Sequence, residues 1–231
     1  MTYKIRFVLL MFFAVIFVVA TPLVVLNARG YQFNFEEKKL INTGGVFLKS
    51  TPKKASIYLN NKLMKVQTPA IINGLMPGEY LVDIELSDFY SWQKQLEIES
   101  GMMVKQDSIL LLPKKPKTTL ISELPKIIIE KKENKLKYDD HEIWLESESE
   151  NKSNNDDQEE IKLITRYAEK IKQAFLYKDQ EHVIFLVGNQ VKFVEIDGTN
   201  TVDFIKADKI LYQDSKLYIL QKQNWFLTEF D

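Results

Sequence analysis

An unbroken apolar stretch near the N-terminus is the first feature of the hydrophobic pattern. Residues 7–26, FVLLMFFAVIFVVATPLVVL, contain no charged side chain. A helix of this length, at about 1.5 Å per residue, spans roughly 30 Å, the thickness of the hydrocarbon core of a bilayer. We therefore predict a transmembrane helix over residues 7–26, with residues 1–6 as an N-terminal tail and residues 27–43 as a polar spacer.

A cleaved secretory signal peptide has the same charged start and apolar centre, so it is the competing interpretation. The apolar run continues beyond Ala20 to Leu26, which favours an uncleaved anchor. Under the positive-inside rule, Lys4 and Arg6 before the run outweigh the basic residues after it only slightly. We expect a single-pass protein of the cell membrane, with a cytoplasmic N-terminus and extracytoplasmic β-domains.

Beyond the spacer, the pattern changes to period-two alternation. In residues 80–86, apolar side chains at every second position share one face. The segment 92–99 repeats this pattern, except that Lys94 interrupts the apolar series. Short alternating segments separated by turn residues predict a small antiparallel β-sandwich over residues 44–113.

Two proline-marked turns enclose one short strand of this region, residues 57–59. Pro52 and Pro69 have a fixed φ and cannot donate to a strand ladder, so they mark the limits of pairing. Asn60-Asn61 predicts a hairpin turn at the end of the strand, because Asn tolerates a positive φ. A structural role therefore explains this stretch without a nucleophile and a base.

Several of these segments together resemble the PEGA domain, a small β-sandwich common in bacterial envelope and surface proteins. The resemblance covers about residues 44–113, and its specificity comes from five short segments in the order and at the spacing of the family. The name-giving tetrapeptide is Pro52-Lys-Lys-Ala55 here, and Asn60-Asn61 replaces the usual Asp-Gly. The resemblance implies binding or scaffolding in the cell envelope and implies no particular ligand. The five segments are Gly44–Pro52, Ala55–Lys62, Thr68-Pro69, Leu75–Tyr80 and Phe89–Trp92.

An internal repeat follows a basic, proline-containing segment, residues 114–125, which we expect to be a linker. In residues 126–231, a Tyr-x-Asp sequence followed by an apolar strand occurs at Tyr138, Tyr177 and Tyr212. A second strand then pairs back in each unit. Repeats of about 35–39 residues are typical of β-propeller blades, so we predict partial, propeller-like β-repeats.

Three units are too few for the usual ring of about 4–8 blades. A truncated propeller, an open stack and completion by another chain are all compatible with the sequence. An open stack would leave an unpaired edge strand, through which the chain would self-associate. Within this region, residues 146–160 contain no apolar side chain, and we expect them to form a disordered acidic loop.

Composition limits the chemistry. The chain has no Cys and two His, so it lacks disulfides, a thiolate nucleophile and the usual ligands of a metal site. The net charge of -1 gives no electrostatic reason to expect nucleic acid as a partner. We therefore expect no catalytic residues, no metal and no cofactor.

Carboxylates and aromatic residues are the remaining candidates. Asp140 is interpreted as the turn Asp that recurs as Asp179 and Asp214, and Glu195 with Asp197 as an unspecific pair near a turn. A hydrolase in the repeat region would require the carboxylates at 140, 179, 195 and 197 to converge on a pocket. The candidate partner-binding face consists of Phe89, Tyr90 and Trp92, because aromatic residues are enriched at contact sites.

The sequence thus predicts an all-β ectodomain on a single N-terminal transmembrane helix, inserted in the lipid bilayer through residues 7–26. The expected function is membrane-anchored, non-enzymatic binding or scaffolding in the cell envelope. The expected partner is an envelope protein or a cell-wall glycan. The alternative is a ligand-sensing ectodomain of a signalling complex.

Overall fold

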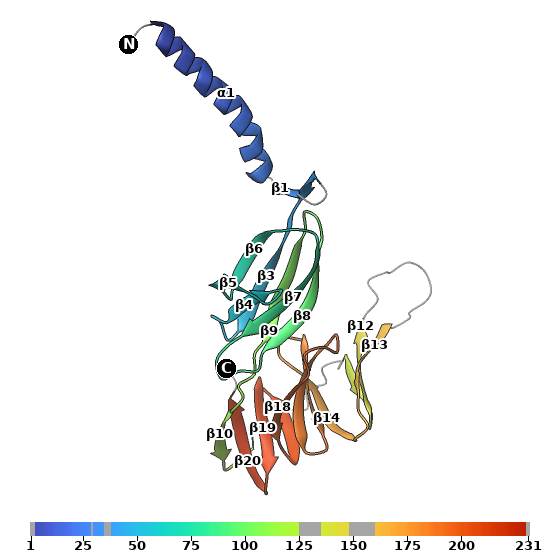
Figure 1. Ribbon diagram of the computed structural model, residues 1–231. Coiled ribbons are helices and arrows are strands. Elements are labelled where there is room, and N and C mark those ends of the chain that lie inside the picture. The colour runs from blue at the N-terminus through green and yellow to red at the C-terminus, as the bar shows by residue number, and fades with distance from the viewer. Residues whose placement is uncertain (1–2, 29, 35–37, 125–134, 148–159, 230–231) are drawn as a thin grey trace.

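One long helix leads into two groups of β-sheets in the computed structural model (Figure 1). The structure describes residues 3–28, 30–34, 38–124, 135–147 and 160–229. Apart from α1, the named elements are strands, so the predicted all-β class behind one N-terminal helix is confirmed. Most of the predicted acidic loop, residues 146–160, lies outside the described residues.

The helix α1 covers Tyr3–Ala28 and extends away from the rest of the molecule (Figure 1). Its segment Ile5–Ala28 has a mean hydropathy of 2.9 and buries none of its surface within the chain. It is therefore long and apolar enough to cross a membrane, as residues 7–26 predicted. A signal sequence near the N-terminus has the same properties.

A small hairpin occupies most of the predicted spacer. Strand β1 (Tyr31–Asn34) pairs antiparallel with β2 (Lys39–Asn42), and Phe33 lies opposite Leu40. Gly30, with a φ of +81° and an N–H that donates to the carbonyl of Asn27 (3.0 Å), forms a turn between the end of α1 and this hairpin.

Two sheets of the sandwich enclose the first core. One has the strand order β6-β3-β9 and the other β5-β4-β7-β8. The predicted antiparallel pairing holds except between β3 and β9, which are parallel. The strands are β3 (Gly44–Thr51), β4 (Ser56–Leu59), β5 (Lys62–Gln67), β6 (Ala70–Leu75), β7 (Gly78–Glu85), β8 (Trp92–Ile98) and β9 (Met103–Leu110).

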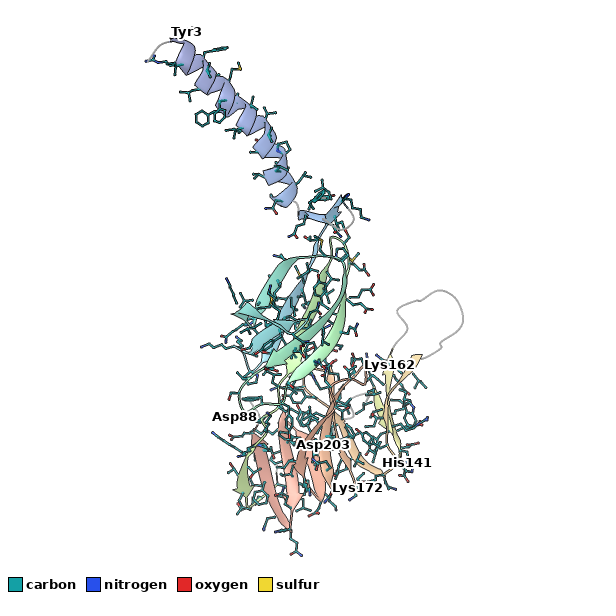
Figure 2. The ribbon with its side chains drawn as sticks, in the orientation of Figure 1. Tyr3, Asp88, His141, Lys162, Lys172 and Asp203 are labelled. Carbon is teal, nitrogen blue, oxygen red and sulfur yellow. The ribbon has the colours of Figure 1, made fainter. Side chains whose placement is uncertain are left out.

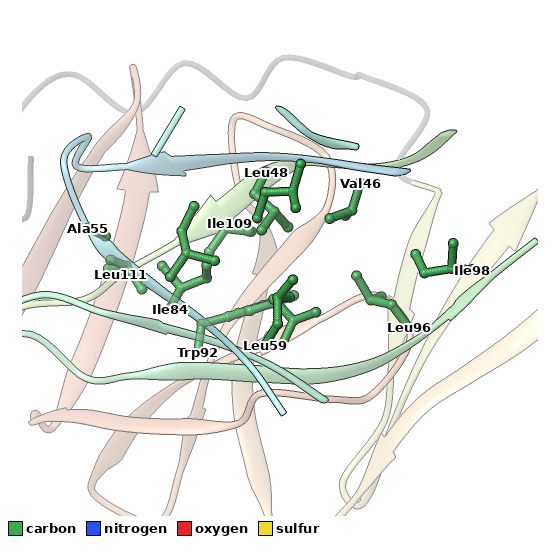
Figure 3. Packing of buried hydrophobic residues seen from close by; sticks show 13 residues of the cluster. Val46, Leu48, Ala55, Leu59, Ile84, Trp92, Leu96, Ile98, Ile109 and Leu111 are labelled. Carbon is green, nitrogen blue, oxygen red and sulfur yellow. The ribbon is translucent and has the colours of Figure 1, made fainter. Parts of the chain in front are cut away.

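The predicted alternation of apolar and polar residues along the strands agrees with which side chains lie in the core of the sandwich. Val82 of β7 is fully buried in the core. Ile84 of β7 and Trp92 of β8 are buried between the two sheets (Figure 3). Asn60 and Asn61 have φ values of 48° and 62° and form the predicted two-residue turn between β4 and β5.

A hydroxyl network closes the turn between Thr51 and Ala55. The Ser50 hydroxyl donates to the carbonyl of Pro52 (2.6 Å) and lies 2.6 Å from the hydroxyl of Thr68. The Thr68 oxygen accepts the backbone N–H of Ala55 (3.1 Å). Since each hydroxyl has one proton, Thr68 donates to Ser50, and every donor of this buried group has an acceptor.

The C-terminal part contains three sheets, which lie beyond the sandwich from α1 (Figure 1). Their strand orders are β11-β12-β13, β14-β15-β16-β17 and β10-β20-β19-β18. The predicted pairing of each apolar strand with the following one is confirmed. That these sheets are propeller blades stays a prediction.

One strand of the last sheet comes from the segment expected to be a linker. Strand β10 (Lys117–Ile121) lies within residues 114–125 and pairs with β20. The other strands are β11 (Leu136–Tyr138), β12 (Glu142–Ser147), β13 (Glu160–Arg166), β14 (Ile171–Leu176), β15 (His182–Val187), β16 (Gln190–Glu195), β17 (Val202–Lys206), β18 (Lys209–Gln213), β19 (Lys216–Gln221) and β20 (Asn224–Glu229).

The turn before β12 differs from the sequence interpretation in one residue. Asp139, rather than Asp140, accepts the backbone N–H groups of His141 (2.7 Å) and Glu142 (2.8 Å). These hydrogen bonds lower the pKa of Asp139. Asp179 caps the corresponding turn before β15, so the equivalent of Asp179 is Asp139.

Candidate functional site

The three predicted partner-binding aromatics lie where the sandwich meets the C-terminal sheets. Trp92 is 3% exposed and belongs to the sandwich core, against which Phe89 is partly buried. Tyr90 packs against the core of the C-terminal sheets, and its N–H donates to the carbonyl of Leu112 (2.8 Å). Their observed neighbours are therefore within the chain, and contact with an outside partner stays a prediction.

A polar cluster joins the two β regions beside Trp92. The indole Nε1 of Trp92 donates a hydrogen bond to Oε1 of Glu195, which is only 8% exposed. Nζ of Lys94 lies 2.8 Å from Oε2 of Glu195 and 2.5 Å from Oδ2 of Asp197. Two side chains of β8 in the sandwich thus bind carboxylates at the end of β16 in the C-terminal region.

The turn after β16 supplies further bonds to the same carboxylate. The hydroxyl of Thr199 lies 2.6 Å from Oδ1 of Asp197 and 3.1 Å from Oε2 of Glu195, and Asn200 donates through Nδ2 to Oε1 of Glu195 (3.1 Å). The Oδ1 of Asn200 accepts the backbone N–H of Gln93 (3.2 Å) across the junction. Glu195 therefore accepts hydrogen bonds from the sandwich and from the C-terminal region, and these bonds compensate for its burial.

Local sequence explains the shape of this turn. Asp197 Oδ1 accepts the backbone N–H of Thr199 (2.9 Å), an arrangement typical of Asp in turns. Gly198 follows with a φ of +86°, and a Cβ at this position would lie 2.6 Å from the carbonyl oxygen of Ile164. Glycine is therefore required both by the backbone angle and by the neighbouring strand.

The charges of the cluster stabilise one another. Burial opposes the positive charge of Lys94, but hydrogen bonds to Asp197 and Glu195 outweigh burial and raise the pKa of Lys94. Burial also opposes the charge of Asp197, but hydrogen bonds from Lys94 and Thr199 outweigh it and lower the pKa of Asp197. Lysine and aspartate therefore both remain charged over a wide range of pH.

A small polar cavity of about 180 Å³ lies beside this cluster, with Lys94, Glu181 and His182 in its wall. Burial, and after it the charge of Asp179, raises the pKa of Glu181. His182 is nearly buried, and its Nδ1 lies 2.8 Å from Oδ2 of Asp179. Within the described residues, no group of three or more Asp, Glu or His side chains is arranged to hold a metal ion.

The four carboxylates required by the hydrolase hypothesis do not form one group of contacts. Glu195 and Asp197 converge on Lys94, whereas Asp179 binds His182. Asp140 is exposed and forms an ion pair with Lys170 (2.7 Å), which is itself exposed. Each of these carboxylates therefore has a partner from the chain itself.

The role of Lys94 was not predicted from the sequence, although Lys94 visibly interrupts the apolar series. Lys94 interrupts an otherwise apolar face of β8, and that interruption marks the position where the strand faces Glu195 and Asp197. A charged residue on a core-facing position indicates a buried partner of opposite charge.

Comparison with family models agrees with the resemblance seen in the segments around Pro52, Pro69 and Trp92. Residues 43–110 match the PEGA domain. The match begins at the buried Thr43 and ends with β9, so the PEGA domain coincides with the two-sheet sandwich. Among the curated proteins compared, none matches this chain.

The match leaves the C-terminal sheets outside the PEGA domain. Glu195 and Asp197 therefore belong to a different part of the chain from the PEGA residues Trp92 and Lys94 that bind them. The polar cluster is a contact between a PEGA domain and its companion region.

Proposed function

We propose that this chain is a membrane-anchored, non-enzymatic binding or scaffold protein of the cell envelope. In this proposal α1 stays in the bilayer as an anchor, and the PEGA domain and the C-terminal sheets lie on the extracytoplasmic side. A PEGA domain behind one apolar helix supports this location. The partner is an envelope protein or a cell-wall glycan.

The hydrogen bonds that the Glu195 carboxylate accepts are the observation that most strongly supports a scaffold role. A catalytic carboxylate needs access to a substrate. Glu195 instead accepts hydrogen bonds from Trp92, Lys94 and Asn200, which belong to two regions of the chain. These hydrogen bonds occupy the Glu195 carboxylate and hold the two regions in one relative position. A fixed relative position suits a rigid binding protein.

A groove next to the predicted aromatic face is the proposed contact with the partner. It has a volume of about 390 Å³, and Phe89 and Tyr90 form part of its wall. Ser87 and Lys114, which are exposed, add polar groups at the same place. An apolar edge with nearby hydrogen-bonding groups suits recognition of a sugar or a peptide segment.

The test is binding of the detergent-solubilised full-length chain to purified peptidoglycan by co-sedimentation, with chemical crosslinking in intact envelopes for protein partners. We expect Ser87→Arg, which fills the groove from an exposed position, to abolish binding. Thr118→Arg is the matched control, because Thr118 is an exposed position on β10 that is not part of the groove wall. Equal binding by the two variants would exclude the groove, and failure of both assays for the unsubstituted chain would contradict the binding function.

A further inference from the structure

Exposed apolar side chains gather where α1 meets the PEGA domain. On β1 and β2, Tyr31, Phe33 and Leu40 are 37%, 46% and 50% exposed. Tyr31 and Phe33 are two positions apart and Leu40 lies opposite Phe33, so the three share one face of the hairpin. Three large apolar side chains are thus exposed on one face of a hairpin of two four-residue strands, and such exposed apolar patches mark sites of contact.

The end of the β8–β9 loop and the start of β9 add one apolar residue each, Met102 and Met103. Met102 and Met103 are 59% and 49% exposed. Both line a cavity of about 520 Å³ whose wall also includes Asn27 and Ala28 at the end of α1. We call Tyr31, Phe33, Leu40, Met102 and Met103 the membrane-proximal collar.

Hydrogen bonds fix the collar to the end of the helix. The N–H of Gly30 donates to the carbonyl of Asn27 (3.0 Å), and the carbonyl of Gly30 accepts both the N–H (2.8 Å) and the hydroxyl (2.7 Å) of Thr43. The carbonyl of Thr43 in turn accepts the N–H of Gly101 (3.3 Å), next to Met102. A continuous series of bonds therefore connects α1 with the hairpin and with the β8–β9 loop.

The short connection limits how far the collar can lie from a membrane that contains α1. Tyr31 is three positions after Ala28, the last residue of α1. Three residues span at most about 11 Å. The headgroup region occupies roughly 5–8 Å on each side of the hydrocarbon core. The hairpin therefore begins within or directly above the headgroups.

We propose that the membrane-proximal collar is a lipid-contacting surface that inserts into the headgroup region of the bilayer around α1. This inference rests on the proposed anchor role of α1. Tyr and Phe suit this depth, because aromatic rings are favoured at the boundary between hydrocarbon and water. Lys38 and Lys39 are exposed on the same hairpin and attract anionic headgroups.

The opposite face of the hairpin lies against the PEGA domain, which supports contact of the collar with lipid. Gln32 alternates with Tyr31 and Phe33, and its Nε2 lies 2.8 Å from the position of a Cβ at Gly74 in the PEGA domain. The face that carries Gln32 thus lies against Gly74, and Tyr31, Phe33 and Leu40 are on the other face of the hairpin. Contact with lipid at the collar would hold the PEGA domain in a defined orientation above the membrane.

The absence of Cys in the chain permits a direct test with single-Cys variants. The full-length variants Phe33→Cys, Leu40→Cys and Met102→Cys carry an environment-sensitive NBD label and are reconstituted into vesicles of phosphatidylcholine and phosphatidylglycerol. Quenching by lipids spin-labelled near the headgroup reports contact with the interface. Val15→Cys, within α1, reports insertion of the helix through quenching by lipids spin-labelled deep in the acyl chains. Leu120→Cys is the matched control, because Leu120 is 63% exposed and lies on β10, far from α1 (Figures 1 and 2).

We expect quenching and a blue-shifted emission at the three collar positions and neither at position 120. If position 15 is quenched but the collar behaves like position 120, the collar proposal is overturned and the anchor stands. If position 15 is not quenched either, both the anchor and the collar are overturned. Thermal unfolding of each labelled variant confirms that the substitution leaves the fold intact.

Discussion

The indole N–H of Trp92 donates a hydrogen bond to the carboxylate of Glu195, and this bond joins the core of the PEGA domain to the C-terminal sheets. Trp92 packs among the apolar residues of the sandwich, and Glu195 lies at the end of β16. Lys94, two positions after Trp92, binds the other oxygen of the same carboxylate. The junction is therefore both packed and charge-paired.

Removal of the Glu195 carboxylate is expected to destabilise the chain. In Glu195→Ala, the buried Trp92 N–H loses its acceptor, and Lys94 keeps only Asp197 as a partner. We expect a loss of roughly 2 kcal/mol in the free energy of unfolding, the usual cost of an unsatisfied buried donor. Urea unfolding in detergent micelles, followed by circular dichroism, measures this loss.

The matched control is Asp140→Ala. Asp140 also pairs with a lysine, Lys170, but both side chains of that pair are more than 60% exposed. Exposed ion pairs contribute about 0–1 kcal/mol, so this variant should unfold close to the unsubstituted chain. If Glu195→Ala also unfolds within about 0.5 kcal/mol of the unsubstituted chain, the Glu195 cluster does not hold the two regions together.

The junction should lose stability at both extremes of pH. The pKa of Asp197 is lowered from its usual 3.8, so its contribution is present above that value and disappears as pH falls through the lower pKa of the folded state. The pKa of Lys94 is raised from 10.5, so its contribution is complete below 10.5 and disappears as pH rises through the higher folded pKa. The melting temperature should therefore be flat near neutral pH with respect to this cluster.

Lys94→Met separates this cluster from the other titrating groups. Without the ammonium group, Asp197 loses the hydrogen bond and the positive charge of Lys94 that lower its pKa, so Asp197 takes up a proton at a higher pH. We expect the acid-side decline of the melting temperature to begin at a higher pH in Lys94→Met than in the unsubstituted chain. Superimposable pH profiles would mean that the ion pair contributes nothing to folding.

Lys94 also shows which part of the junction could be predicted from the sequence and which part could not. The apolar face of β8 was predictable from its alternation, because a half-buried strand alternates between core and solvent. The interruption at Lys94 was visible, but its partners, Glu195 and Asp197, are about a hundred residues away in the sequence. Spacing within one segment cannot reveal a contact between regions that meet only after folding.

Local sequence also failed to predict three strands, β10, β1 and β2. Lys117–Ile121 follows prolines and lysines and was interpreted as a linker, yet it forms β10 because β20 offers it a free edge. The four-residue strands β1 and β2 lie in the predicted polar spacer, where a short hairpin gives too few alternating positions to stand out. In contrast, Asn60-Asn61 was predictable, since the positive φ values of that turn depend on the two residues themselves.

A further prediction concerns the hydroxyl network of the PEGA domain. Thr68 is 2% exposed and accepts the N–H of Ala55. Thr68→Val keeps the side-chain shape but leaves that N–H without an acceptor, so we expect a loss of about 1–3 kcal/mol. Thr118→Val is the control, because an exposed substitution usually changes stability by less than about 0.5 kcal/mol. Equal unfolding midpoints in urea for the two variants would contradict a structural role for Ser50 and Thr68.

We propose that α1 anchors the chain and that the β regions lie outside the cytoplasm. In the Cys-free chain, Lys62→Cys places one thiol at the exposed start of β5, and Tyr3→Cys places one at the start of α1. Intact cells that produce each variant are treated with a membrane-impermeant maleimide, and a second portion is treated after lysis. We expect labelling of position 62 in intact cells and of position 3 only after lysis. Labelling of position 62 only after lysis would place the PEGA domain in the cytoplasm and overturn the extracytoplasmic location.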